Sequence, residues 1–241
     1  MRSLSLLILI CLPLAFSAQY TDIGGWYFIK GSKDIVKHWK LSAEGDLRMD
    51  HQFGNLETAF VDLTVENSPT KIFEWAVNYR FGNSYESRSM YSLRHRWSVD
   101  AGIKTELAKF DIKARLRYQW AQSDIQVNDL YHPWSQQLRT KLSASHKVFK
   151  RTFLEVSGEV WWSMSTGHYG QPTDFRISTG LERRVGKRNY VSLSAIWNRS
   201  FDAIVPTNEW VGALGFKRDF KGDIFKKKKK KKATDDAMIG S

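Results

Sequence analysis

The chain has 241 residues, of which 42% are hydrophobic and 14% aromatic, and its formal net charge is +12. Its negative mean hydropathy excludes a polytopic helical membrane protein, which needs repeated apolar runs of about 20 residues. Ten Trp, nine Tyr and fourteen Phe exclude a disordered chain, because so many large apolar groups need a structure that takes them out of water.

The first eighteen residues have the three parts of a secretory signal peptide. Arg2 precedes an apolar stretch over 4–16, and small residues follow at Ser17 and Ala18. The apolar stretch is too short to cross a bilayer as a helix. Because Cys11 is the only cysteine and lies in this stretch, we expect a mature chain without cysteine. Such a chain has neither a disulfide scaffold nor thiol catalysis.

Nearly every later segment alternates apolar and polar residues with a period of two, which is typical of strands whose faces lie in different environments. Within 71–82, Phe73, Val77 and Phe81 share one face, whereas Glu74 and Arg80 share the other. The pattern predicts eleven strands, several of them as long as a bilayer-spanning strand. They are expected over residues 24–31, 38–50, 56–66, 71–82, 88–105, 109–122, 136–147, 152–163, 174–185, 189–199 and 208–220.

Connections between these strands are expected to alternate in length, as in outer-membrane barrels with short periplasmic turns and longer external loops. The short ones are expected at 33–37, 67–70, 106–109, 149–151 and 186–188, and the longer ones at 50–55, 82–87, 122–135, 165–174 and 200–208. Tryptophans gather near the strand ends, and several fit an interfacial girdle. They are Trp26, Trp39, Trp97, Trp120, Trp134, Trp161, Trp162, Trp197 and Trp210.

We therefore predict an all-β fold: a single antiparallel up-and-down transmembrane β-barrel of 10–12 strands over residues 19–220, with an even number of strands. The polar faces interleave Arg with Asp and Glu, and the signal peptide, the lack of cysteine, the long strands, the aromatic strand ends and the alternating loop lengths favour an apolar exterior around a charged interior. The alternation also permits a secreted or periplasmic β-sandwich, or a lipocalin-like barrel that carries an apolar ligand. We expect an outer-membrane location in a Gram-negative bacterium, with export by a cleavable signal peptide.

The last predicted strand ends at Phe220, and an aromatic end resembles the last strand of outer-membrane barrels, which serves as an assembly signal. The expected partners are the barrel-assembly machinery and outer-membrane lipid. Residues 221–241 form a Lys-rich tail, expected to be disordered, with seven consecutive Lys from Lys226 to Lys232. Nucleic acid is not an expected partner, because the chain is exported and its body lacks a one-sided basic face.

Two consecutive strands joined by a short basic turn resemble the central hairpin of small outer-membrane proteins catalogued as domain-of-unknown-function family 2490. The residues that carry the resemblance are His95, Arg96, Trp97, Arg115, Leu116 and Arg117. The opening aromatic strand, its short turn and the next strand, which ends near Arg48, fit as well. The resemblance covers about residues 24–220 and implies a bacterial outer-membrane barrel without an assigned activity.

Charged residues on the polar faces predict a charged lumen, either a packed network of ion pairs or a small anion-selective pore. The basic members are Arg48, Arg80, Arg94, Arg96, Arg115, Arg117, Arg139 and Arg176. The acidic members are Glu44, Asp46, Asp62, Glu74, Asp100, Asp111, Glu155, Glu159 and Glu182. The predicted function is accordingly structural, or the passage of small solutes including anions.

No phosphate-binding glycine motif, H-E-x-x-H or G-x-S-x-G occurs in the chain. We therefore expect no catalytic residue, metal or cofactor. The alternative is an outer-membrane enzyme that modifies lipid, with the loop histidines His132 and His168 meeting Asp129 and Asp174 above the barrel.

Overall fold

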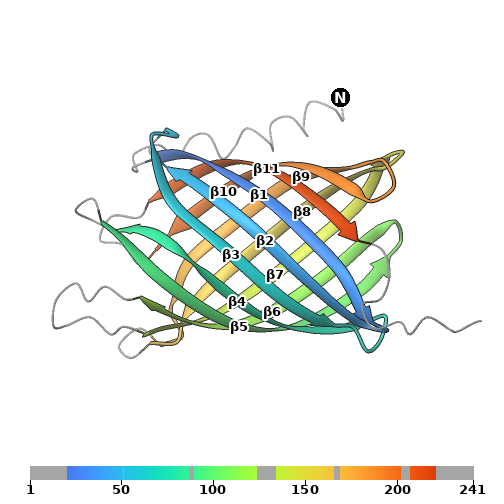
Figure 1. Ribbon diagram of the computed structural model, residues 1–241, viewed down its shortest axis with the longest axis horizontal. Helices are drawn as coiled ribbons and strands as arrows, with labels where there is room; N and C mark the ends of the chain where they lie inside the picture. The colour runs from blue at the N-terminus through green and yellow to red at the C-terminus, as the bar shows by residue number, and fades with distance from the viewer. Residues whose placement is uncertain are drawn as a thin grey trace, which may run out of the picture.

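The computed structural model describes residues 21–50, 52–86, 90–123, 134–165, 169–201 and 207–220, and these residues form one closed β-barrel (Figure 1). Its strands are β1 (Thr21–Val36), β2 (Trp39–Asp50), β3 (Asn55–Asn67), β4 (Phe73–Glu86), β5 (Met90–Leu107), β6 (Phe110–Ser123), β7 (Trp134–Phe149), β8 (Thr152–Ser163), β9 (Pro172–Val185), β10 (Asn189–Ser200) and β11 (Asn208–Phe220). Among the described residues there is no helix able to cross a membrane.

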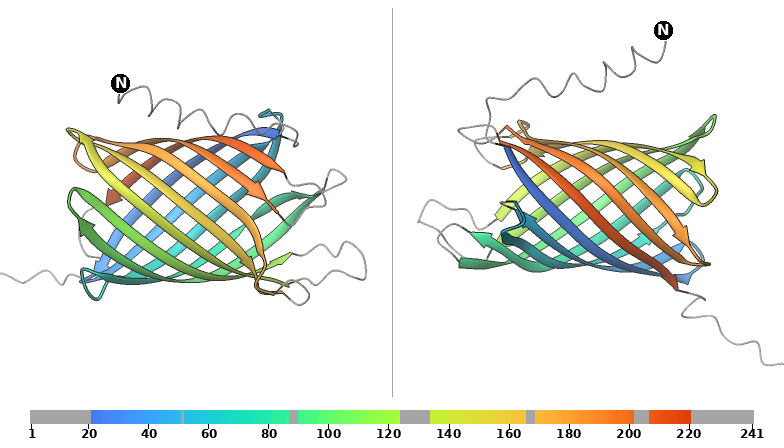
Figure 2. Two further views of the ribbon diagram at one scale, coloured as in Figure 1. Left: turned by 180° about the vertical axis from the view of Figure 1, so that it is seen from behind. Right: turned by 90° about the horizontal axis from the view of Figure 1, so that it is seen from above.

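Each strand pairs with its chain neighbours in antiparallel fashion, and the sheet closes where β1 meets β11 (Figures 1 and 2). That last pair is parallel, and its register runs from Thr21 beside Asn208 to Lys33 beside Phe220. An odd number of up-and-down strands brings the last strand back in the direction of the first, so the closing pair has to be parallel. The single up-and-down barrel is confirmed, and the expectation of an even strand number is wrong.

Most predicted connections are shorter in the structure, because strand pairing continues further than the apolar alternation, whereas the one between β3 and β4 is longer and spans 68–72. β1 extends to Val36, so the connection expected at 33–37 shrinks to Lys37 and His38. At the other end, β2 and β3 are joined by 51–54, where Gln52 and Phe53 have positive φ. β4 and β5 are joined by 87–89, because the cross-strand pair of Tyr85 and Tyr91 extends the ladder.

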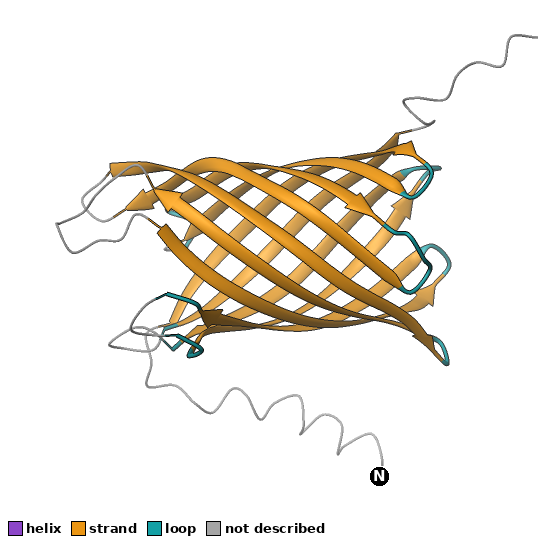
Figure 3. Cartoon of the chain, turned by 90° about the horizontal axis from the view of Figure 1, so that it is seen from below, coloured by secondary structure: helices purple, strands orange, loops and turns teal. Residues whose placement is uncertain are grey.

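The two ends of the barrel differ in their connections (Figure 3). The turns after β1, β3, β5, β7 and β9 lie at one end, which we call the turn end. The connections after β2, β4, β6, β8 and β10 lie at the other end, which we call the loop end. β1 begins at the loop end and β11 finishes at the turn end, because the two strands are parallel.

The wall of the barrel is inverted relative to that of a soluble β-sandwich. Of the described residues that are buried, seven are hydrophobic and eighteen are polar or charged. On β4, Phe73, Val77 and Phe81 are exposed on the outer surface, whereas Glu74 and Asn78 are buried on the inner face. The apolar residues predicted to share one face thus cover the outside of the barrel.

The close approach of β3 and β4 generates a prediction about stability. Gly82 pairs with Phe60, and a Cβ atom added to Gly82 would collide with the backbone oxygen of Ala59 and the Cβ of Phe60. We expect Gly82→Ala to lower the free energy of unfolding by about 1–3 kcal/mol, the usual cost of overpacking. Urea unfolding in detergent micelles measures this change.

The matched control is Gly212→Ala, because a Cβ atom at Gly212 meets nothing within 4 Å. We expect this variant to unfold at the same urea concentration as the parent chain. An equal loss of stability in both variants would contradict the close packing of β3 against β4.

Candidate functional site

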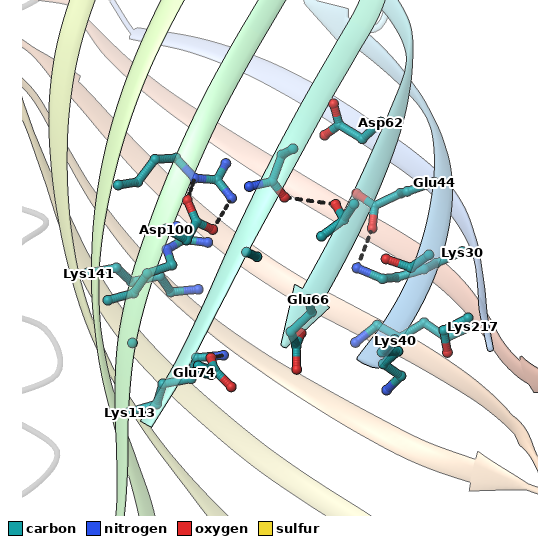
Figure 4. A pocket seen from close by; sticks show the side chains of 18 of the residues that line it. Lys30, Lys40, Glu44, Asp62, Glu66, Glu74, Asp100, Lys113, Lys141 and Lys217 are labelled. Carbon is teal, nitrogen blue, oxygen red and sulfur yellow. Dashed lines mark hydrogen bonds and ion pairs between the residues drawn. The ribbon is translucent and has the colours of Figure 1, made fainter. Parts of the chain in front are cut away.

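A cavity of about 920 Å³ fills the turn-end half of the barrel and is lined mainly by polar side chains (Figure 4). Five Lys, eight Arg and nine Asp or Glu line it, so its formal net charge is +4. The basic residues are Lys30, Lys40, Arg48, Arg80, Arg96, Lys113, Arg115, Arg117, Arg139, Lys141, Arg176, Arg184 and Lys217. The acidic residues are Glu44, Asp62, Glu66, Glu74, Asp100, Glu155, Glu159, Glu182 and Asp219.

Near the turn end, lysines pair with glutamates one or two strands away, as with Lys30 and Glu44 (Figure 4). The carboxylate of Glu74, which is 6% exposed, contacts both Lys104 of β5 and Lys113 of β6. The other Lys–Glu pairs have N–O distances of 3.2 Å for Lys30–Glu44, 2.5 Å for Lys217–Glu182 and 3.7 Å for Lys141–Glu155. The Lys side chains are partly exposed, so each of these pairs adds little to stability.

At mid-height of the barrel, arginines pair with aspartates that lie directly opposite them on the adjacent strand. Arg80 of β4 donates through Nε and Nη2 to the two oxygens of Asp62 on β3, at 2.7 and 2.5 Å. Arg117 of β6 donates in the same two-pronged way to Asp100 on β5, at 2.7 Å for both bonds. Two parallel charged hydrogen bonds fix the orientation of each guanidinium.

A third carboxylate at this level, Glu159 of β8, is shared by two arginines. Its Oε1 lies 2.8 Å from Nη2 of Arg115 and 2.9 Å from Nη2 of Arg139. Arg139 also donates to Oε1 of Gln119 at 3.3 Å. Glu159 is 4% exposed and Arg139 is 8% exposed, so water screens this group poorly.

Aromatic rings inside the barrel hold four arginines in place. The guanidinium carbon of Arg48 lies 4.0 Å from the ring centroid of Trp26, and that of Arg80 lies 3.3 Å from Phe60. Arg176 lies 4.7 Å from the rings of both Trp26 and Trp161. A cation over a Trp face is attracted by the ring electrons, most strongly where water is excluded.

The fourth of these arginines is Arg139, whose guanidinium carbon lies 4.5 Å from the ring of Trp161. Trp26 and Trp161 are each 8% exposed and point into the barrel. The interfacial position predicted for these two tryptophans is therefore wrong. Both rings share a strand face with inward polar residues, so they pack against cations rather than at the outer surface.

This arginine–aromatic layer, formed by Trp26, Arg48, Trp161 and Arg176, separates two cavities. Toward the loop end lies a second cavity of about 310 Å³, lined by all four residues of the layer, by the carboxylates of Glu57, Asp174 and Glu209, and by Gln137, Phe175, Asn198, Ser200 and Thr207. Arg48, Trp161 and Arg176 line both cavities. Two guanidinium groups therefore lie where the two cavities meet.

Fourteen of the seventeen residues of the predicted charge network line the larger cavity. They are Arg48, Arg80, Arg96, Arg115, Arg117, Arg139, Arg176, Glu44, Asp62, Glu74, Asp100, Glu155, Glu159 and Glu182. Of the other three, Arg94 lies on the same face of β5 nearer the loop end and is exposed, Asp46 is buried and accepts from Arg48, and Asp111 is exposed. The lysines of the turn end and the two inward tryptophans are not among the predicted lumen residues. The period of two nevertheless places each of them on a polar face.

Most residues of the alternative lipid-modifying site fall outside the part of the chain that the structure describes. His132, His168 and Asp129 lie outside the described residues, and Asp174 lines the smaller cavity. Of the other histidines, His95 is on the outer surface, with its Nδ1 2.8 Å from the hydroxyl of Tyr79. Within the described ranges, no group of three or more His, Cys, Asp or Glu side chains is arranged to hold a metal ion.

The shared carboxylate of Glu159 generates a prediction about the interior. We expect Glu159→Gln to lower the free energy of unfolding by about 3 kcal/mol, because two arginines lose the charge that compensates them in a poorly hydrated site. The control is Glu155→Gln on the same strand, whose side chain is 55% exposed and which we expect to change stability little. Urea unfolding in micelles compares the two, and equal losses would contradict a structural role for the Glu159 pairs.

Among solved structures, the chain is similar to one titled "Bacterial polysaccharide outer membrane secretin", with 12% sequence identity and a TM-score of 0.45. The match covers 76% of this chain and 63% of that chain, so the present chain spans less than two thirds of that protein. No curated protein matches the chain.

A family model described as "Protein of unknown function (DUF2490)" matches residues 23–206, which include the hairpin of β5 and β6 and all but the last strand of the barrel. The resemblance noted in that hairpin is thereby confirmed, and the chain belongs to this family.

Proposed function

We propose that this protein is an outer-membrane β-barrel whose Arg-rich, charged lumen passes small solutes, with a preference for anions. The inverted wall supports insertion into a membrane. Large apolar side chains such as Ile29, Leu142 and Leu193 are 60% or more exposed on the outside, whereas carboxylates and guanidinium groups line the inside. Lipid contact favours such an exterior, and a water-filled interior favours such a lining.

The same inversion disfavours the soluble carrier. A carrier of apolar ligands needs an apolar cavity, and the larger cavity of this barrel is lined by thirteen cationic and nine acidic side chains. The apolar cluster inside the described barrel is small and consists of Trp26, Ile196, Val211 and Ala213.

Export and assembly complete the proposal. The signal peptide over 1–18 would direct the chain across the inner membrane, and the last strand, which ends at Phe220, would present an aromatic end to the barrel-assembly machinery. Phe220 is 50% exposed and lies at the turn end, which is periplasmic in this proposal. Residues 221–241, with the Lys run, lie outside the described residues.

The preference for anions rests on the net charge of the larger cavity and on the two arginines where the cavities meet. The larger cavity has a formal net charge of +4, and Arg48 and Arg176 flank the point where it meets the smaller cavity. An anion on this path would meet the guanidinium groups of Arg176 and of Arg48, which is paired with Asp46 at 3.1 Å, and the excess of basic side chains in the larger cavity would disfavour a cation.

We expect the purified protein in planar bilayers to form channels whose zero-current potential in a KCl gradient has the sign for chloride selectivity. Arg176→Gln removes one charge from the arginine–aromatic layer. We expect this variant to lower the preference for chloride over potassium roughly threefold, because a unit charge about 7 Å away in water is worth about 0.6 kcal/mol. Arg183→Gln is the control, because Arg183 is exposed and does not line the cavity.

The absence of channels at any voltage would contradict the proposal and favour a purely structural barrel. A purely structural role is the second candidate function, because the arginine–aromatic layer separates the two cavities. Channels that prefer potassium, or an equal change in both variants, would contradict the assignment of selectivity to the layer.

A further inference from the structure

Arg96 differs from the other arginines at mid-height, because Arg115 and Arg139 reach Glu159, whereas neither of the residues that directly face Arg96 can accept a hydrogen bond from it. On β4 it faces Arg80, and on β6 it faces Ala121. Like charges directly opposite each other on adjacent strands are destabilising. Within the described part of the chain, Arg96 makes no hydrogen bond and no ion pair, although it lines the larger cavity.

The carboxylates around Arg96 are already engaged by other arginines. Asp62 holds Arg80 by two hydrogen bonds, and Asp100 holds Arg117 in the same way. The charges that act on Arg96 are those of Arg80, Arg139 and Arg117, with Asp62 the acidic member. The surroundings of Arg96 therefore carry an excess of positive charge.

Two further donors in the same cavity lack acceptors. Asn78 is one diagonal step from Arg96 in the register of β4 and β5, and it is 9% exposed. Its amide oxygen accepts from the hydroxyl of Thr64 at 2.8 Å, and its Nδ2 has no acceptor among the described residues. Nε of Arg115 also has none, but Arg115 lies six residues further along the ladder of β5 and β6, so only the Asn78 donor is near Arg96. Buried donors without acceptors are costly and rare in folded proteins.

We infer that this wall of the lumen is a binding site for a small oxyanion, a phosphate or sulfate group, that Arg96 anchors. The missing group has to be an acceptor with several oxygens and at least one negative charge, because the unpaired groups are a guanidinium and N–H donors. The cavity of about 920 Å³ has room for a free ion or for the same group carried on a sugar. The inference deepens the proposed passage of anions by assigning the place at which an anion is held.

The test is isothermal titration of the full-length protein in an uncharged detergent with inorganic phosphate, at about 0.15 M NaCl so that weak surface attraction is screened. We expect saturable binding to the parent chain, and roughly tenfold or greater weakening in Arg96→Gln, because a charged hydrogen-bond donor is lost. Arg183→Gln should bind as the parent does. Titration with a sugar phosphate distinguishes a site for the free ion from one for a phosphorylated solute.

A second variant, Ala121→Glu, keeps the test independent of folding defects in Arg96→Gln. It places a carboxylate directly opposite Arg96 and supplies the missing partner from the chain itself. We expect Ala121→Glu to abolish phosphate binding while the barrel keeps or gains resistance to urea. Phosphate binding that neither substitution alters would overturn the assignment, and so would the absence of saturable binding.

These results are separable from those that test passage. Phosphate binding that depends on Arg96 in a protein without channels supports the site and contradicts passage. Anion-selective channels without such binding overturn the site and leave passage intact.

Discussion

The pairing of inward-facing charges across adjacent strands is the constraint on which the rest of this barrel depends. A guanidinium turned into a closed sheet needs a carboxylate, another oxygen acceptor, an aromatic face or water, and the strand register supplies the carboxylates of the two-pronged pairs. Asp62 lies opposite Arg80, and Asp100 lies opposite Arg117, so each two-pronged pair links neighbouring strands. Once these charges are satisfied inside, the alternation of the strands leaves the apolar side chains on the outside.

The same constraint explains the closure. Lys30 and Ser32 of β1 face the interior, where Lys30 pairs with Glu44 of β2 and Ser32 hydrogen bonds to Asp219 of β11. Pairing of these polar groups on both sides favours continuation of β1 to Val36, far beyond its apolar portion. The parallel seam is therefore held by interior polar contacts as well as by its backbone ladder.

Most of the fold was predictable from the sequence, because a period of two is a strong signal and the strand count of eleven followed from it. A count of eleven up-and-down strands also implies the parallel closure. The expectation of an even strand number followed a general rule for outer-membrane barrels, and that rule does not hold for this chain. The faces of Trp26 and Trp161 were predictable too: Trp161 shares the parity of Glu159 on β8. The ion pairs were not, because alternation shows which face a residue occupies but not which residue lies opposite it. Register depends on turn lengths, and most of the connections are shorter than the polarity of the segments indicates.

The central claim is that adjacent residues of one strand face lipid and a hydrated lumen in turn, and Glu155 and Val156 of β8 test it most directly. Glu155 lines the cavity, whereas Val156 is 47% exposed on the outside. In a mature chain without cysteine, Glu155→Cys and Val156→Cys each introduce a single thiol. The accessibility of that thiol is measured after the protein is reconstituted into lipid vesicles. We expect a charged, water-soluble thiol reagent to modify Glu155→Cys. When a fluorophore is attached to each thiol, we expect nitroxide-labelled acyl chains to quench only the fluorophore on Val156→Cys. The opposite pattern, or equal accessibility to water at both positions, would contradict the central claim.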